Sequence, residues 1–81
     1  MPYLLKYDPA AEAVHDAMPT EASEQLTLAL ADVCQDPLGR SIPYGEDDKV
    51  MRMVITDHAF AVILVGHVLK TVTVLQINHL A

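Results

Sequence analysis

The fold is decided by the stretch from Val50 to Leu80, which reads VMRMVITDHAFAVILVGHVLKTVTVLQINHL. It contains three strand-like segments separated by short turns: Val50 to Thr56, Ala59 to Val65 and Lys70 to Ile77. The middle segment is apolar throughout, as expected of a central strand covered on both faces, and the last is rich in residues that pack well in sheets. The stretch therefore predicts a three-stranded antiparallel meander.

The residues before this stretch predict one strand and two helices. Pro2 to Tyr7 is strand-like, and Asp8-Pro9 is a helix start because the carboxylate accepts from free amides and proline suits the first helical position. A first helix runs from Pro9 to about Met18, and a second runs from Pro19 to Asp36. The first helix has an apolar face made of Ala10, Val14, Ala17 and Met18. The short connection between the helices predicts an antiparallel αα-hairpin.

Together these elements predict an α+β fold in a single domain spanning residues 1–81. An N-terminal strand leads into the αα-hairpin, a long loop follows from Pro37 to Lys49, and the helices pack on one face of the sheet. Met51 and Met53 alternate with Arg52 and so share one face, which we expect to be the core beneath the helices.

The composition predicts a protein partner. The chain of 81 residues is 52% hydrophobic with a mean hydropathy of +0.25, yet a chain of this length buries only roughly 60 to 65% of its unfolded surface. Either the core is unusually dry or part of the surface is covered by a partner, and we favour the partner. A net charge of −6 disfavours unaided binding to RNA or DNA, which depends on cations. The acidity either keeps the protein soluble or complements a basic partner.

The cysteine content and the apolar runs indicate a reduced, cytoplasmic setting. Cys34 is the single cysteine, so there is neither an intramolecular disulfide nor a Cys/His zinc spacing. The N-terminus lacks the basic start and long apolar run of a signal peptide. The run from Ala59 to Leu69 is too short to span a bilayer, so no membrane association is expected. His15, His58 and His67 lack metal-binding spacing and are expected to be solvated, and no cofactor is predicted.

The order of elements and several short motifs resemble the RelE/ParE superfamily of toxins from bacterial type II toxin-antitoxin pairs. Tyr7-Asp8-Pro9-Ala10-Ala11-Glu12-Ala13 is similar to the family's first strand and helix opening, and Asp36-Pro37 is similar to the close of its second helix. Residues 50–58 resemble the arginine-bearing strand and turn, and residues 72–79 resemble the terminal strand. The resemblance covers nearly the whole chain. It implies a toxin that is neutralised by an antitoxin and acts either as a ribosome-dependent mRNA endonuclease or on gyrase.

The resemblance also implies which residues would carry a reaction. Family members that cleave RNA need no metal, but they need a base, an acid and cations that stabilise charge on phosphorus. An arginine usually follows the turn, where this chain has Ala59, and some endonucleases end in a His-Tyr pair, where this chain has His79-Leu80. An active enzyme would be a metal-independent mRNA endoribonuclease with a reduced catalytic set: Arg52, His79 and Lys49.

Each candidate residue also has a structural interpretation. Arg52 either holds a phosphate or an antitoxin carboxylate, or it faces water or pairs with a nearby acid such as Asp57. His79 is either a general acid or base or a frayed terminal residue.

Three functions remain open: a toxin with diverged chemistry, an active endonuclease, and a catalytically silent module of this fold for interaction or dimerisation. We also expect a homodimer, because the apolar fraction is high and the terminal strand is expected to leave an open edge.

Overall fold

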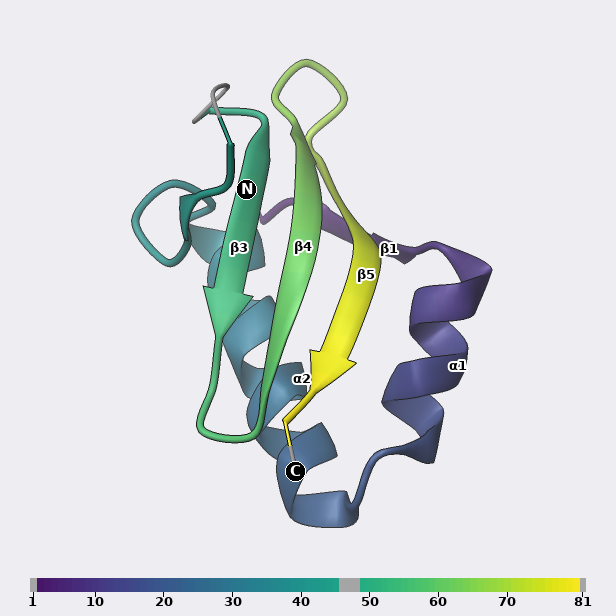
Figure 1. The fold of residues 1–81 in the computed structure, drawn as a ribbon. Coiled ribbons are helices and arrows are strands. Elements are labelled where there is room, and N and C mark those ends of the chain that lie inside the picture. Colours follow the sequence, from purple (N-terminus) through teal and green to yellow (C-terminus); the bar gives the residue numbers. More distant parts are fainter. Residues whose placement is uncertain (1, 46–48, 81) are drawn as a thin grey trace.

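The computed structural model describes residues 2–45 and 49–80, which form a five-stranded mixed sheet with two helices on one face (Figure 1). The elements in chain order are β1 (Leu4–Tyr7), α1 (Pro9–Ala17), α2 (Thr20–Gln35), β2 (Ile42–Pro43), β3 (Met51–Ile55), β4 (Ala59–Gly66) and β5 (Thr71–His79). Strands β3, β4 and β5 form the predicted antiparallel meander. The predicted α+β fold is confirmed, and no helix among the described residues is long and apolar enough to cross a membrane.

The order of strands in the sheet is β1-β5-β4-β3-β2, and it differs from expectation at both edges. Strand β1 pairs in parallel with β5 over Thr71 to Val74. The open edge predicted for the terminal strand is therefore closed along this part, while residues 75–79 have no strand partner on that side among the described residues. The two-residue strand β2 lies within the predicted loop and pairs with β3. The outermost strands, β1 and β2, are the shortest, and short edge strands limit pairing with other chains.

Helix α1 begins as predicted but packs on a different face. The Asp8 carboxylate caps the helix by accepting from the amide of Ala10 at 3.3 Å. The face turned toward the sheet contains Ala11 and Met18, with His15 between them, whereas the predicted face residues Ala10, Val14 and Ala17 are exposed. The pattern of apolar residues predicted the wrong face, because the polar residue His15 lies at the centre of the buried face.

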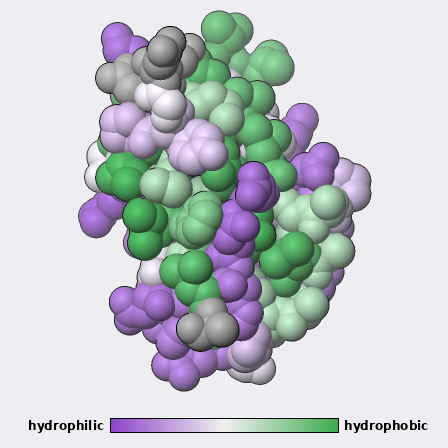
Figure 2. Space-filling model, viewed as in Figure 1, coloured by the Kyte–Doolittle hydropathy of each residue, from purple (hydrophilic) through white to green (hydrophobic). Residues whose placement is uncertain are grey.

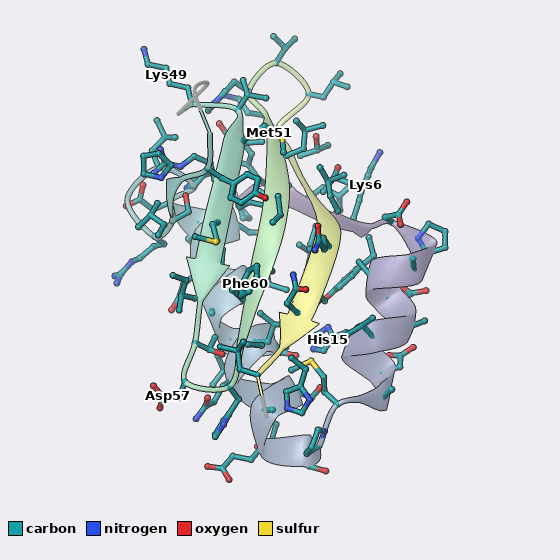
Figure 3. All side chains as sticks on the ribbon, viewed as in Figure 1. Lys6, His15, Lys49, Met51, Asp57 and Phe60 are labelled. Carbon is teal, nitrogen blue, oxygen red and sulfur yellow. The ribbon has the colours of Figure 1, made fainter. Side chains whose placement is uncertain are left out.

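His15 joins three elements through hydrogen bonds. Its Nε2 donates to the carbonyl oxygen of Ser23 at 3.2 Å and lies 3.1 Å from the Thr27 hydroxyl. Since Nε2 carries the proton, Nδ1 accepts from the hydroxyl of Tyr7 at 2.9 Å. His15 therefore connects β1, α1 and α2 and is not the solvated histidine that the sequence suggested (Figure 3).

The core lies between α2 and the sheet. Helix α2 contributes one buried stripe: Ala22, Leu26, Leu30, Val33 and Cys34. The sheet contributes alternate residues of its three long strands: Val54, Ala59, Ala61, Ile63, Val65, Val72, Val74 and Ile77. Val74 and Ile77 both face the helices although they are three residues apart, because the β4–β5 register shifts between Val62 and Ile63. Such a bulge places one extra residue in β5 and reverses the alternation beyond it.

Tyr7 makes the stability of this arrangement sensitive to alkaline pH. Burial, followed by the nearby carboxylates of Glu12 and Asp16, raises the pKa of the Tyr7 phenol above its ordinary value of 10.0. A raised folded-state pKa gives a stabilisation that is present below the unfolded pKa and is lost as pH rises through the folded value. Tyr7→Phe should cost about 0.5 to 1.5 kcal/mol at pH 7, through the lost hydrogen bond to His15, and should flatten the alkaline decline.

Urea unfolding of the wild type and of Tyr7→Phe between pH 7 and pH 11 measures both effects. Tyr44→Phe is the control, because Tyr44 is exposed and its hydroxyl makes no hydrogen bond with the other described residues that the structure records. An alkaline decline of equal steepness in the wild type and in Tyr7→Phe would contradict the assignment.

Candidate functional site

The face of the sheet that points away from the helices is apolar. Arg52 and Val54 are buried on the helix side of β3, so Met51, Met53 and Ile55 point to the opposite side. Residues directly opposite in an antiparallel pair share a face. This face, called the open face below, consists of Ile42, Met51, Met53, Ile55, Phe60, Val62 and Leu64. The prediction that the two methionines lie beneath the helices is therefore wrong.

No described element covers the open face. Ile55 is 58% exposed, and Ile42 and Leu64 are also exposed, while Val62 is buried by its neighbours on the same side of the sheet. Figure 2 views this face and shows hydrophobic residues gathered over β3 and β4, beside a line of hydrophilic residues along β5. Met51 and Phe60 lie over the sheet in the same view (Figure 3). An exposed apolar surface of this kind marks an interaction site.

The polar residues beside the open face suit a protein better than a nucleic acid. Gln76 and Asn78 of β5 pair with Val62 and Phe60 and so lie on the same side. The side-chain nitrogen of Asn78 is buried and has no hydrogen-bond partner within the described ranges. Among the described strand residues on this side, Lys6 is the single cation. Phosphate groups would find little positive charge here, whereas an apolar protein surface could pack on the exposed hydrophobic residues beside these polar ones.

Arg52 lies on the other side of the sheet and is only 7% exposed. Its Nε donates to the Ser41 hydroxyl at 2.9 Å, and its Nη2 donates to the carbonyl oxygens of Leu38 at 3.1 Å and Ser41 at 2.7 Å. The Ser41 hydroxyl in turn donates to the carbonyl of Pro37. The guanidinium therefore attaches the loop after α2 to the edge of the sheet.

His79 lies at the far end of the sheet, in a small pocket of about 260 Å³. The pocket is lined by Pro19, Glu21, Ala22, His58, His79 and Leu80. The amide of Leu80 donates to the carbonyl oxygen of His58 at 2.7 Å, which brings the end of β5 to the β3–β4 turn. Sequence reasoning missed this proximity of the two histidines, because it depends on the shifted register between β4 and β5.

The three predicted catalytic residues do not share one site. Arg52 and His79 pair with Ile63 and Ala59 of β4, and this separation along the strand corresponds to roughly 13 Å. Lys49 precedes β3 at the end of the sheet opposite the Asp57 turn (Figure 3), where its carbonyl accepts from Nε2 of His67 at 2.6 Å. The structure thus places Lys49 and Arg52 toward one end and His79 at the other. Their catalytic roles stay a prediction.

Three further features bear on which reactions the described residues could catalyse. Ala59 is fully buried in the core on the helix side, so the position where the resemblance expects an arginine has no room for one. Within residues 2–45 and 49–80, no group of three His, Cys, Asp or Glu side chains could hold a metal ion. Cys34 is buried, and this burial raises the pKa of its thiol, which disfavours the reactive thiolate.

Comparison with known proteins found similar solved structures but no similar sequences. No protein-family model matches the sequence, and no curated protein matches it. The isolated E. coli RelE toxin superposes with a TM-score of 0.83 at 20% identity, over 98% of this chain and 85% of that chain. The RelBE2 toxin-antitoxin complex from Mycobacterium tuberculosis gives 0.81 at 16% identity, over 98% and 99% of the two chains.

A third similar structure is archaeal. The RelE-RelB complex from Pyrococcus horikoshii OT3 gives a TM-score of 0.73 at 11% identity, over 98% of this chain and 96% of that chain. These likenesses span almost the whole of this chain and confirm the predicted RelE-like fold.

Proposed function

We propose that this chain, which has the fold of the RelE toxins, is the toxin-fold subunit of a type II toxin-antitoxin pair, and that its antitoxin covers the open face. The observation that carries the proposal is the uncovered apolar surface of Met51, Met53, Ile55, Phe60 and Leu64. Similar structures include complexes in which a RelE protein is bound to RelB. A chain of this size gains stability when such a surface is buried.

The open face indicates the chemistry of the antitoxin segment. The segment should be amphipathic, with its apolar side chains over β3 and β4. Basic residues around these contacts would complement the net charge of −6 and would speed association. Such a segment resembles the helix or strand that other proteins lay into an apolar groove.

The proposed action takes place in the cytoplasm, on translation or on gyrase. The net negative charge of the chain favours a protein target. Cleavage of mRNA by Arg52, His79 and Lys49 would require the three groups at one phosphate, and they lie apart. The second candidate is a catalytically silent interaction module. It is favoured by the buried Ala59 and by the guanidinium of Arg52, which is bonded to the loop carbonyls of Leu38 and Ser41.

Induction in a bacterial host tests these functions. We expect growth arrest when the chain is induced alone and recovery when the protein encoded by the adjacent gene is co-induced, without new mRNA 5′ ends. His79→Ala and Lys49→Ala should arrest growth like the wild type, since both are exposed and make no joint site.

Three outcomes would change the assignment. Arrest accompanied by mRNA cleavage that His79→Ala abolishes would establish the endonuclease. A stable complex with the adjacent gene product but no arrest would establish the silent module. Absence of both arrest and complex would overturn the toxin-antitoxin proposal.

A further inference from the structure

The turn between β4 and β5 carries two apolar side chains into solvent. Val68 is 93% exposed and Leu69 is 79% exposed, and they are neighbours at the tip of the hairpin. Figure 1 shows this turn projecting beyond the end of the sheet, and Figure 2 shows hydrophobic residues at its apex. Single exposed apolar residues are common, but a projecting pair can fill a pocket on another surface.

Several contacts hold the tip in one shape. His67 donates from Nε2 to the carbonyl oxygen of Lys49 at 2.6 Å, so its Nδ1 is free of hydrogen and faces the Tyr3 hydroxyl at 3.4 Å. The amide of Leu4 donates to the carbonyl of Lys70 at 2.8 Å, and the Lys70 ammonium lies 5.3 Å from the centre of the Tyr3 ring. Lys70 itself has a φ of 57°, a left-handed conformation that is uncommon for residues other than glycine. A tip that is already ordered loses little conformational freedom on binding.

The outer side of α2 offers a complementary surface. Leu28 is 68% exposed and borders a shallow depression of about 280 Å³ that is also lined by Ser23, Glu24 and Thr27. Glu24 and Asp32 lie four residues before and after Leu28 and are exposed. Residues at this spacing lie on the same side of a helix. An apolar side chain is thus placed between two carboxylates.

We propose that the β4–β5 tip of one copy of this chain docks on the outer side of α2 of a second copy. Val68 and Leu69 would pack against Leu28, and the Lys70 ammonium would approach the carboxylates that flank it. The two surfaces are different, so the contact is head-to-tail and either closes into a ring or extends. This contact does not use the open face and is independent of the proposed antitoxin.

Mixing two variants tests the contact by sedimentation equilibrium. Val68→Ser with Leu69→Ser removes the tip and leaves α2 intact, whereas Leu28→Ser does the reverse. Each variant alone should associate at least tenfold more weakly than the wild type. Their equimolar mixture should regain association that stops at a 1:1 pair, which a folding defect in either variant could not produce. Ile55→Ser removes an exposed side chain of the open face and should associate like the wild type.

A second pair of variants tests the charges. Lys70→Glu should weaken association, and adding Glu24→Lys in the same chain should restore it. A wild type that stays monomeric at high concentration would overturn the proposal, as would a mixture that stays monomeric. If Ile55→Ser abolishes association while Val68→Ser with Leu69→Ser still associates like the wild type, the proposal is overturned. The copies would then associate through their open faces.

Discussion

Arg52→Ala is expected to lower the free energy of unfolding by about 2 to 4 kcal/mol, because a buried charged donor with several acceptors is removed. The carbonyls of Leu38 and Ser41 would lose their bonds to the guanidinium, and the loop after α2 would detach from the edge of the sheet. Domains of this kind have only about 5 to 15 kcal/mol in total. The midpoint of thermal unfolding should therefore fall by roughly 10 to 25 °C.

Two further variants separate this stabilising role from general effects of losing a cation. Arg40→Ala removes an exposed arginine from the same loop, and should change stability by less than about 0.5 kcal/mol. Arg52→Lys keeps the charge but not the planar fork, so it should recover only part of the loss. Chemical and thermal unfolding measure all three. If Arg52→Ala unfolds at the wild-type midpoint, the loop contacts do not stabilise the domain and a role for Arg52 at a ligand becomes the better explanation.

The second large effect concerns the open face. Ile55→Asp combined with Leu64→Asp should weaken the complex with the adjacent gene product by at least about 100-fold, because two carboxylates would be buried without partners. Both side chains are exposed in the free chain, so the variant should still fold. Isothermal titration calorimetry measures the affinity.

Leu28→Asp is the matched control for this variant. Leu28 is at least as exposed as Ile55, but it lies on α2, on the other side of the sheet. It should bind the adjacent gene product with unchanged affinity. If Leu28→Asp and the open-face variant lose the same affinity for the adjacent gene product, the antitoxin does not bind specifically to the open face.

The elements of the fold could be predicted from sequence because their signals are local. Apolar runs separated by turn residues located β3, β4 and β5, and Asp8-Pro9 located the start of α1. The parallel pairing of β1 with β5 could not be predicted, since it joins segments more than sixty residues apart. No local pattern records such a pairing.

The functional surface was harder to predict than the fold. Alternation in β3 separates Met51 and Met53 from Arg52, but alternation does not say which set faces the helices. An arginine is usually exposed and a methionine usually buried, so the ordinary preference gave the wrong side. Here the polar carbonyls of the loop satisfy Arg52, and the methionines lie on the open face.

The neighbours of His79 needed the register of β5, which sequence did not reveal. The extra residue of the bulge reverses the alternation after Val74, so His79 lies beside the buried Ala59 and near His58. Without that register, His79 could only be assigned from resemblance to a family. The register explains why its predicted partners Arg52 and Lys49 are distant.

The most direct measurement follows the methionine methyl groups by NMR while the adjacent gene product is added to the folded chain. Met51 and Met53 lie on the open face, whereas Met18 is buried in the core at the end of α1 and is an internal reference. If the antitoxin covers the open face, the resonances of Met51 and Met53 should shift or broaden in proportion to the complex formed, and that of Met18 should stay unchanged. A complex that forms while Met51 and Met53 keep their free-state resonances would contradict the account.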